Sequence, residues 1–313
     1  MYFKYFIIII FSVLIIYFFQ INYWEQIWEN SKKRDYIKWI LCDKLIAKKY
    51  AENNGFNVTK LYQYCKYPHQ LKEPLLPYVV KPVDLCNSEG VYLMKNGINL
   101  IDNKKYRFQD IKKNLVKLRS QSNKKYYMTT YMYSHLVANN GYIVEELLLE
   151  NNKMINDYKC YTFQGKVWFI ACTYNRKIEN GTQTFNSIWM TRDWKPIIFP
   201  MIKNGYLFQK LDKPKGLDDM ISKVENISLE LNRHCRIDVY LKDGITYFGE
   251  FTFFGGAFLH TRICNNILGL LWKIYPDVVI NDKRIINDKK IINEIENLVD
   301  KNYVSNHPND LQL

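Results

Sequence analysis

The sequence lacks several patterns that mark common classes of protein. Its seven cysteines are odd in number, scattered and without a C-x-x-C pair, which argues against a disulfide framework or a zinc site and favours free thiols in a reducing compartment. The P-loop pattern G-x-x-x-x-G-K-[ST] is absent. No arginine-rich tract or zinc spacing occurs, so we expect no nucleic-acid partner. The five histidines suggest no Ser/His/Asp triad.

What the sequence does contain is apolar and basic residues. Its 313 residues are 48% hydrophobic and 16% aromatic, which excludes a disordered chain and allows one large domain or two closely packed ones. The net charge of +13 has two interpretations. It follows either from general overuse of Lys, Asn, Ile and Tyr, or from an anionic partner such as a nucleotide, a phosphate, an acidic glycan or an anionic lipid. Charge alone does not decide between them.

The N-terminal segment is strongly apolar. Residues 5–19 are apolar apart from Ser12, and with their neighbours they approach the ~20 residues that a spanning helix needs. Tyr23, Trp24 and Trp28 suit an interfacial aromatic belt. A cleaved signal peptide is the first alternative, but no small-residue cleavage site follows the segment. A buried core helix is the second, but nothing on the segment is polar enough to mark a solvent face. We therefore predict one N-terminal transmembrane anchor.

The charges around this segment predict its orientation. Only Lys4 precedes it, whereas Lys32, Lys33, Arg34 and Lys38 follow it. The positive-inside rule then places the main domain in the cytosol. Sequons at three asparagines would argue for the lumen if they were used, but such sequons arise by chance in an Asn-rich chain.

The remaining sequence alternates irregular strands with helices, which predicts an α+β fold rather than a regular parallel α/β sheet. Helical spacing covers residues 31–55, 107–121 and 217–234, and strands are expected within 76–96, 141–150, 156–177 and 236–253. We expect four parts: an anchor at 1–24, a short segment at 31–75, a nucleotide-binding and catalytic domain at 76–275, and a helical tail at 276–313.

Two carboxylates interrupt an otherwise apolar hairpin, "RIDVYLKDGITYFGEFTFFGG". Asp238 shares a strand face with Arg236, and Glu250 lies across the hairpin. Two close carboxylates with one arginine to offset them suit Mg²⁺ beside substrate phosphates. A buried Arg236–Glu250 ion pair is the alternative. Strict alternation puts the apolar face on Ile237, Val239 and Leu241, then on Tyr247, Gly249, Phe251 and Phe253.

Two other strands end in charged residues. Lys81 closes "YVVKP" and precedes a small polar loop whose N–H groups suit a phosphate, unless this lysine is simply solvated. Glu145 and Glu146 lie in "YIVEELLL", where a strand leading into a linker suits an adenine edge, unless both are solvated at a strand end.

The next hairpin adds further charges. Lys159 and Arg176 are suited to bind phosphates, and Asp157 is suited to accept a hydrogen bond from a ribose hydroxyl. The alternative is that these three residues form ion pairs at the surface.

In this order, these motifs resemble the TupA-like branch of the ATP-grasp superfamily, which is associated with teichuronopeptide and surface-polysaccharide biosynthesis. The resemblance begins at "CDKLIAKKYAENNG", with Asp43 and Lys44, and passes through "VVKP", "SEG", "IVEELL", "DYKCYTFQGK", "RIDVY" and "GEFTF" to Gly269. It implies a nucleotide held between two antiparallel-sheet lobes, with ATP and Mg²⁺ as ligands.

The resemblance also implies roles for individual residues. Many ATP-grasp enzymes have Asn two residues after the metal-binding Glu, whereas this chain has Thr252, as the TupA-like branch does, and its hydroxyl still suits Mg²⁺ or a coordinated water. The implied roles are ATP phosphates for Lys81 and Lys159, a flap at Ser88–Gly90, an adenine hinge at Glu145, Glu146 and Leu148, a ribose contact for Asp157, the transferred phosphoryl group for Arg236, and magnesium for Asp238, Glu250 and Thr252. From its place in the hairpin, Arg176 is the third predicted catalytic residue, with Arg236 and Lys159.

The activity implied is that of a membrane-anchored carboxylate–amine ligase, which forms an amide through an acylphosphate in glycan biosynthesis. Its acid and amine are not identified by the sequence, because the substrate domain that usually precedes the nucleotide lobe is replaced by about fifty residues. A glycan or a lipid-linked precursor is a candidate. A kinase, a glycosyltransferase-associated protein (although no D-x-D occurs) and a non-catalytic nucleotide- or glycan-binding protein are the alternatives.

Overall fold

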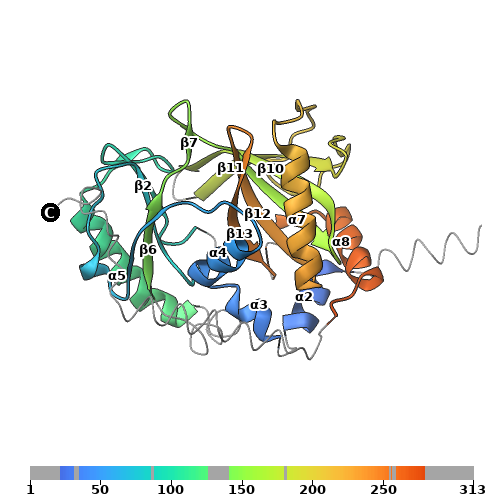
Figure 1. Cartoon of the computed structure of the whole chain (residues 1–313), viewed down its shortest axis with the longest axis horizontal. Helices are drawn as coiled ribbons and strands as arrows, with labels where there is room; N and C mark the ends of the chain where they lie inside the picture. The colour runs from blue at the N-terminus through green and yellow to red at the C-terminus, as the bar shows by residue number, and fades with distance from the viewer. Residues whose placement is uncertain are drawn as a thin grey trace, which may run out of the picture.

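The computed structural model describes residues 22–31, 35–85, 88–125, 141–179, 182–253, 255 and 259–278. Two antiparallel sheets dominate this part of the chain (Figure 1). The first has six strands in the order β1 (Leu61–Cys65), β6 (Tyr142–Glu146), β2 (Tyr78–Pro82), β3 (Tyr92–Lys95), β4 (Ile98–Asn99) and β5 (Lys104–Lys105). The second has five, in the order β11 (Thr182–Thr191), β10 (Lys166–Glu179), β9 (Asp157–Phe163), β12 (Cys235–Lys242) and β13 (Ile245–Thr252). The prediction of an α+β fold with two antiparallel sheets is confirmed.

Helices cover both sheets. In the first sheet, apolar side chains from every second strand position pack against Phe108, Ile111 and Leu115 of α5. In the second sheet, one face packs against α4 and α7 and part of the other against α2 and α8. The helices are α2 (Tyr23–Ser31), α3 (Tyr36–Ile40), α4 (Lys44–Asn53), α5 (Phe108–Lys125), α7 (Leu217–Leu231) and α8 (Arg262–Ile274), with a 3-10 turn at Pro68–Gln70 and a small hairpin of β7 (Leu149–Glu150) and β8 (Lys153–Met154) between the sheets.

Helix α4 lies between the two sheets (Figure 1). The expected single helix over 31–55 is instead broken into α3 and α4, because the side chain of Asp43 caps α4 and accepts hydrogen bonds from the N–H groups of Leu45 and Ile46. Ring contacts join Tyr50 to Phe251 of β13 at 6.1 Å. The motif with Asp43 and Lys44 therefore starts a helix that joins the N-terminal segment to the second sheet.

A bulge in β13 sets the faces of the hairpin. Asp238 pairs with Glu250, but Val239 pairs with Phe248, so Gly249 has no partner of its own. A Cβ atom at Gly249 would lie 2.7 Å from the carbonyl oxygen of Asp238, which leaves room for glycine alone. Phe248, rather than Tyr247 or Gly249, therefore enters the core with Phe251 and Phe253. The strict alternation expected from the sequence is wrong at Tyr247 and Gly249.

The predicted membrane anchor at residues 1–24 overlaps the start of helix α2. Tyr23 is only 1% exposed, and its hydroxyl lies 2.6 Å from His234 Nε2. A place for Tyr23 in an interfacial belt is therefore wrong, because α2 packs on α8 as part of the core. The expected anchor otherwise falls on residues 1–21, outside the described residues. Among the residues that are described, no helix is long and apolar enough to cross a membrane.

The C-terminal end of the described chain is also tied to the core. The carboxylate of Asp277 pairs with Lys38 and accepts hydrogen bonds from the backbone N–H of His234 at 2.7 Å and the indole of Trp272 at 3.0 Å. Packed structure thus extends past residue 275, and the rest of the expected tail, 279–313, lies outside the described residues.

Candidate active site

One face of the second sheet changes from apolar to charged along its strands. On β9 the residues facing this side are Asp157, Lys159, Tyr161 and Phe163, because alternate residues share a face. Tyr161 and Phe163 pack under α2 and α8. The opposite end of the face carries the charges, since Lys159 pairs in register with Asp238, and Asp238 with Glu250. The sheet thus gathers most of the sequence-predicted catalytic and metal-binding residues in one place.

Asp238 is the centre of this charged group. Its Oδ1 lies 2.6 Å from Arg236 Nε, and its Oδ2 lies 2.6 Å from Lys159 Nζ. The side chain is 2% exposed. Burial by itself raises the pKa of a carboxyl group, but Arg236 and Lys159 outweigh burial and lower the pKa of Asp238 below its ordinary value. Asp238 is therefore an ionised and doubly paired carboxylate.

Asp157 extends the group along β9. Its Oδ2 accepts from Lys159 Nζ at 2.6 Å and from Arg176 Nη2 at 2.7 Å. Its Oδ1 is buried and has no hydrogen-bond partner. Buried carboxylate oxygens normally have a partner, so an unpaired one fits a donor from a ligand, such as a sugar hydroxyl. The surface-pair interpretation of Asp157 does not account for this atom.

Glu250 and Thr252 complete the charged end. The Glu250 side chain is 41% exposed, and its Oε1 is 3.4 Å from Arg236 Nη2. Thr252 Oγ1 accepts from the same Nη2 at 3.0 Å. The alternative of a buried Arg236–Glu250 pair is therefore wrong, because Arg236 pairs mainly with Asp238. The expectation that Arg236 alone offsets the two carboxylates is also wrong, because Lys159 neutralises Asp238 as well.

These residues fit a magnesium ion only together with a substrate. Asp238, Glu250 and Thr252 offer the oxygen ligands that Mg²⁺ takes, on one face of two adjacent strands. No group of three or more His, Cys, Asp or Glu residues suited to a metal occurs within the described ranges. Two carboxylates and a hydroxyl match a cation whose remaining ligands are phosphates and water. Asp238 would have to exchange its contacts with Arg236 or Lys159 for the metal.

A second charged group lies in the first sheet. Glu145 of β6 is 3% exposed. Its Oε1 is 2.6 Å from Lys81 Nζ of β2, and its Oε2 is 2.5 Å from Lys48 Nζ of α4. Burial raises the pKa of Glu145, but the two lysines outweigh burial and lower it to about 2. Solvated side chains at Lys81 and Glu145 are thus ruled out.

The predicted adenine hinge begins where β6 ends. The Glu146 N–H donates to the carbonyl of Lys60 at 2.8 Å, and the Glu146 side chain is half-buried. Leu148 is buried in the link between β6 and β7. The strand does end at a connection between the two sheets, as the sequence indicates. Both oxygens of Glu145 are taken by lysines, which leaves the backbone beyond Glu146 as the part of this segment suited to a base edge.

The predicted flap lies between β2 and β3. Ser88 and Gly90 both have left-handed backbone, with φ of 58° and 71°. A Cβ atom at Gly90 would lie 2.7 Å from Cδ2 of Leu118, so the turn packs on α5 and requires glycine there. Asp84 beside it forms a bidentate pair with Arg119 of α5, with nitrogen–oxygen distances of 2.6 and 2.7 Å. Cys86 and Asn87 of the loop lie outside the described residues.

Two lysines of α4 have contacts that the sequence did not predict: Lys44 was noted only as part of the opening motif, and Lys48 was not singled out. Lys44 Nζ donates to the carbonyl of Leu85, next to the predicted flap, and Lys48 reaches Glu145. Both lie on the buried stripe of α4 with Ala47 and Ala51. The signal that identifies them is their spacing, because two lysines four residues apart on an apolar helix face need buried partners.

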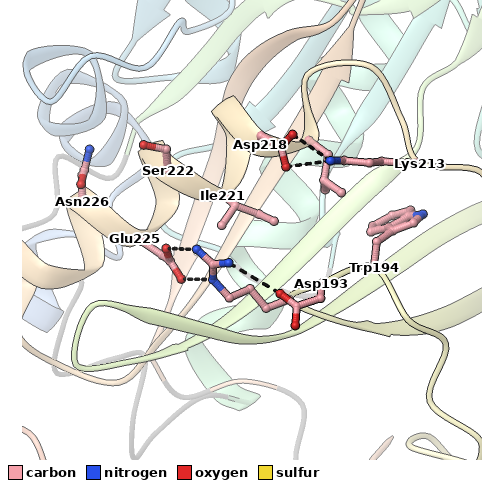
Figure 2. Close-up of a pocket in the computed structure, with 10 residues that line it drawn as sticks. Asp193, Trp194, Lys213, Asp218, Ile221, Ser222, Glu225 and Asn226 are labelled. Carbon is pink, nitrogen blue, oxygen red and sulfur yellow. Dashed lines mark hydrogen bonds and ion pairs between the residues drawn. The ribbon is translucent and has the colours of Figure 1, made fainter.

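A separate cavity of about 430 Å³ lies on the face of the second sheet that α7 covers. Figure 2 shows that Lys213 pairs with Asp218 beside it, and Arg192 pairs with Glu225 at 2.8 Å. None of the predicted site residues lines it. We place the candidate active site on the opposite, polar face, because the unpaired oxygen of Asp157 and the exposed carboxylate of Glu250 are there.

Comparisons with known proteins give three kinds of result. No curated protein matches the chain. Among solved structures, D-alanine–D-alanine ligase from Bacillus anthracis complexed with ATP is 14% identical over 82% of this chain and 68% of its own, with a TM-score of 0.43. The Helicobacter pylori D-alanine–D-alanine ligase is 13% identical over 74% and 60%, with a TM-score of 0.38. L-amino acid ligase from Bacillus licheniformis is 15% identical over 80% and 48%, also with a TM-score of 0.38.

A family model gives the decisive result. The model of the TupA-like ATP-grasp family matches residues 25–273, which include both sheets, the connection between them and every residue of the two charged groups. The chain belongs to the TupA-like ATP-grasp family.

Proposed function

We propose that the protein is a membrane-anchored, ATP-dependent carboxylate–amine ligase that forms an amide through an acylphosphate in polysaccharide or glycan biosynthesis. The observation that carries this proposal is the charged end of the second sheet. There, partly buried cations pair with two buried carboxylates around an unpaired Asp157 oxygen, while Glu250 is partly exposed. Membership of the ATP-grasp family supports ATP as the nucleotide.

Each cation of the site has a defined part in this reaction. Arg236 would turn its guanidinium group toward the transferred phosphoryl group, where negative charge develops in the transition state. Lys159 and Arg176, now held by Asp157 and Asp238, would provide charge along the phosphate chain. Asp157 would accept a ribose hydroxyl through its free Oδ1. The ion pairs keep these charges beside the site before the nucleotide binds, and some of them would be exchanged for contacts with phosphate and magnesium on binding.

The carboxylates would hold magnesium. When bound, the ion would neutralise phosphate charge and bridge the nucleotide to the protein. Asp238 is already ionised, and Glu250 is partly exposed beside Thr252. These three side chains would therefore position the phosphates in front of Arg236.

The proposed membrane anchoring and the proposed substrate class rest on the N-terminal sequence and on the family. The apolar run at residues 5–19 supports an anchor, and the basic residues after it support a cytosolic catalytic domain. The chain belongs to the TupA-like family, and the resemblance to that branch, which is associated with surface-polysaccharide biosynthesis, supports a glycan or lipid-linked precursor as the substrate. The donor acid and the acceptor amine are to be found by experiment.

A product assay tests the proposal. Purified protein is incubated with ATP, Mg²⁺ and a panel of amino acids and uronic acids, and products are identified by mass spectrometry and a phosphate assay. A ligase gives ADP, free phosphate and an amide. Phosphoester without free phosphate would identify a kinase instead. Nucleotide binding without turnover on any substrate would favour a non-catalytic binding protein.

A further inference from the structure

The carboxylate of Glu145 has three partners from three parts of the chain. Lys81 of β2 holds Oε1, whereas Lys48 of α4 and the hydroxyl of Thr59 hold Oε2. Lys48 also donates to Thr59 Oγ1. The side chains of Lys48 and Glu145 are almost fully buried, and that of Lys81 is 15% exposed. Lys81 is thus the partner nearest to solvent.

The charges of this cluster do not balance. Two ammonium groups face one carboxylate, so the cluster carries one net positive charge, and Lys81 is its partly exposed member. Burial lowers the pKa of Lys48, Glu145 opposes this effect, and Lys81 adds to it because two like charges repel. An anion that approached Lys81 would relieve this imbalance.

Lys81 can leave Glu145 for a ligand only if another cation stays beside that carboxylate. If Glu145 had Lys81 as its only cation, the departure of Lys81 would leave a buried and uncompensated carboxylate, which is strongly unfavourable. With Lys48 and Thr59 in place, Glu145 keeps a cation and a hydrogen bond on Oε2. The second lysine therefore removes the cost of that departure.

We infer that Lys48 is a positioning residue for nucleotide binding: it holds the charge of Glu145 from α4 so that Lys81 is free to contact a nucleotide phosphate. This inference rests on the proposed function, in which Lys81 binds a phosphate. It gives the N-terminal segment, which contains α4, a part in the nucleotide site. Lys48 itself does not touch the nucleotide.

The first experiment measures binding rather than turnover. Isothermal titration calorimetry with Mg²⁺ and the non-hydrolysable analogue adenylyl imidodiphosphate compares the wild type with Lys48→Met and Lys48→Arg. We expect at least a tenfold loss of affinity for Lys48→Met and a loss of no more than about threefold for Lys48→Arg, which keeps the charge. Lys49→Met is the matched control, because Lys49 on the same helix pairs only with the exposed Glu52 at 2.9 Å.

A second background separates charge compensation from a packing role. In Glu145→Gln there is no carboxylate to neutralise, so adding Lys48→Met should change the affinity for the analogue by no more than about threefold. A tenfold loss in this background would overturn the inference, since Lys48 would then act directly on the ligand or on the shape of α4. The same conclusion follows if the double variant does not fold.

A pH series supplies a signature that a packing defect would not show. The charged groups facing Glu145 are Lys48 from α4 and Lys81 from β2, with Glu146 acting on Lys48 from the next position of β6. In Lys48→Met, release of Lys81 would favour protonation of Glu145, so binding would take up a proton. The affinity ratio of wild type to variant should therefore shrink as the pH falls from 8 to 6. A ratio that stays constant would contradict the inference.

The failure of this inference differs from the failure of the proposed function. If the wild type does not bind the analogue, or if Lys81→Ala binds it as well as the wild type, the proposed role of Lys81 is wrong. If Lys81→Ala loses affinity but Lys48→Met does not, the nucleotide site stands and Lys48 has no positioning role.

Discussion

At the scale of single residues, Asp238 and Glu250 differ more than their shared place in the hairpin suggests. Asp238 is buried and paired with Arg236 and Lys159, whereas Glu250 is 41% exposed and makes one contact of 3.4 Å with Arg236. We expect Asp238→Asn to lower the free energy of unfolding by about 3 kcal/mol, because two buried cations lose their shared counterion. Chemical denaturation without nucleotide measures this change.

The matched variant is Glu250→Gln. We expect it to change the free energy of unfolding by no more than about 0.5 kcal/mol, because an exposed pair contributes little. It should nonetheless remove most of the thermal stabilisation by Mg²⁺ and ATP, since stabilisation follows affinity for the folded state. If Glu250→Gln costs more stability than Asp238→Asn and keeps the response to Mg²⁺ and ATP, the metal-site interpretation of Glu250 fails.

At the scale of elements, the cap of α4 makes stability depend on pH. Burial raises the pKa of Asp43 to about 7, although the N–H groups of Ile46 and Leu45 oppose this shift. A raised pKa means that the folded state binds the proton more tightly than the unfolded state does. The stability contributed by this group is therefore complete below the unfolded pKa of about 3.9 and is lost as the pH rises through about 7.

The variant Asp43→Asn tests this cap. Asparagine caps a helix as well as aspartate does and carries no charge. We expect the stability of Asp43→Asn relative to the wild type to increase between pH 4 and pH 8, by an amount on the order of 4 kcal/mol. Urea unfolding at each pH gives the difference, in which the other titrating groups cancel. A difference that does not vary with pH would show that Asp43 stays ionised throughout.

The bulge of β13 gives a second prediction at this scale. Gly249→Ala would place a Cβ atom 2.7 Å from the carbonyl oxygen of Asp238. Neither backbone can move away easily, because the two strands are paired on both sides of the bulge. We expect a loss of about 2 kcal/mol in unfolding free energy, together with weaker binding of Mg²⁺ and ATP, because the bulge brings Glu250 opposite Asp238. Calorimetry and denaturation measure the two effects. A variant with normal stability and affinity would show that the hairpin accommodates the methyl group.

The same hairpin shows what sequence can and cannot predict. Alternation correctly puts Ile237, Val239 and Phe251 in the core, because period-two patterns reflect a buried sheet face. It fails at Tyr247 and Gly249, since a bulge depends on how two strands meet. The pairing of Lys48 with Glu145 was equally hidden, because it joins a helix to a distant strand. The order of the motifs predicted the family and the charged residues of the site. The ion-pair partners of those residues could not be predicted, because they depend on how distant segments pack in the fold.

At the scale of the whole molecule, the packing of the N-terminal helix α2 limits where the chain can be cut to separate the catalytic domain from the proposed membrane anchor. Tyr23 packs against Trp272 with ring centroids 5.6 Å apart and reaches His234 with its hydroxyl. Helix α2 therefore belongs to the packed core, and the membrane anchor that we propose must end before this helix begins. Of the expected anchor at residues 1–24, Tyr23 and Trp24 belong to α2, so we propose that the anchor ends at or before residue 21.

Two truncations test this boundary. A chain that starts at residue 22 should leave the membrane fraction, fold and bind Mg²⁺ with ATP, because it keeps the whole of α2, which begins at Tyr23, and removes the apolar run. A chain that starts at residue 25 should lose about 3 kcal/mol of unfolding free energy, the usual cost of removing a buried aromatic side chain. Tyr23→Ala in the longer chain should reproduce that loss, which separates the side chain from the extra length. If the longer chain does not fold, residues 1–21 belong to the core and the proposed anchor is wrong; if it folds but stays with the membrane, the attachment lies elsewhere on the molecule.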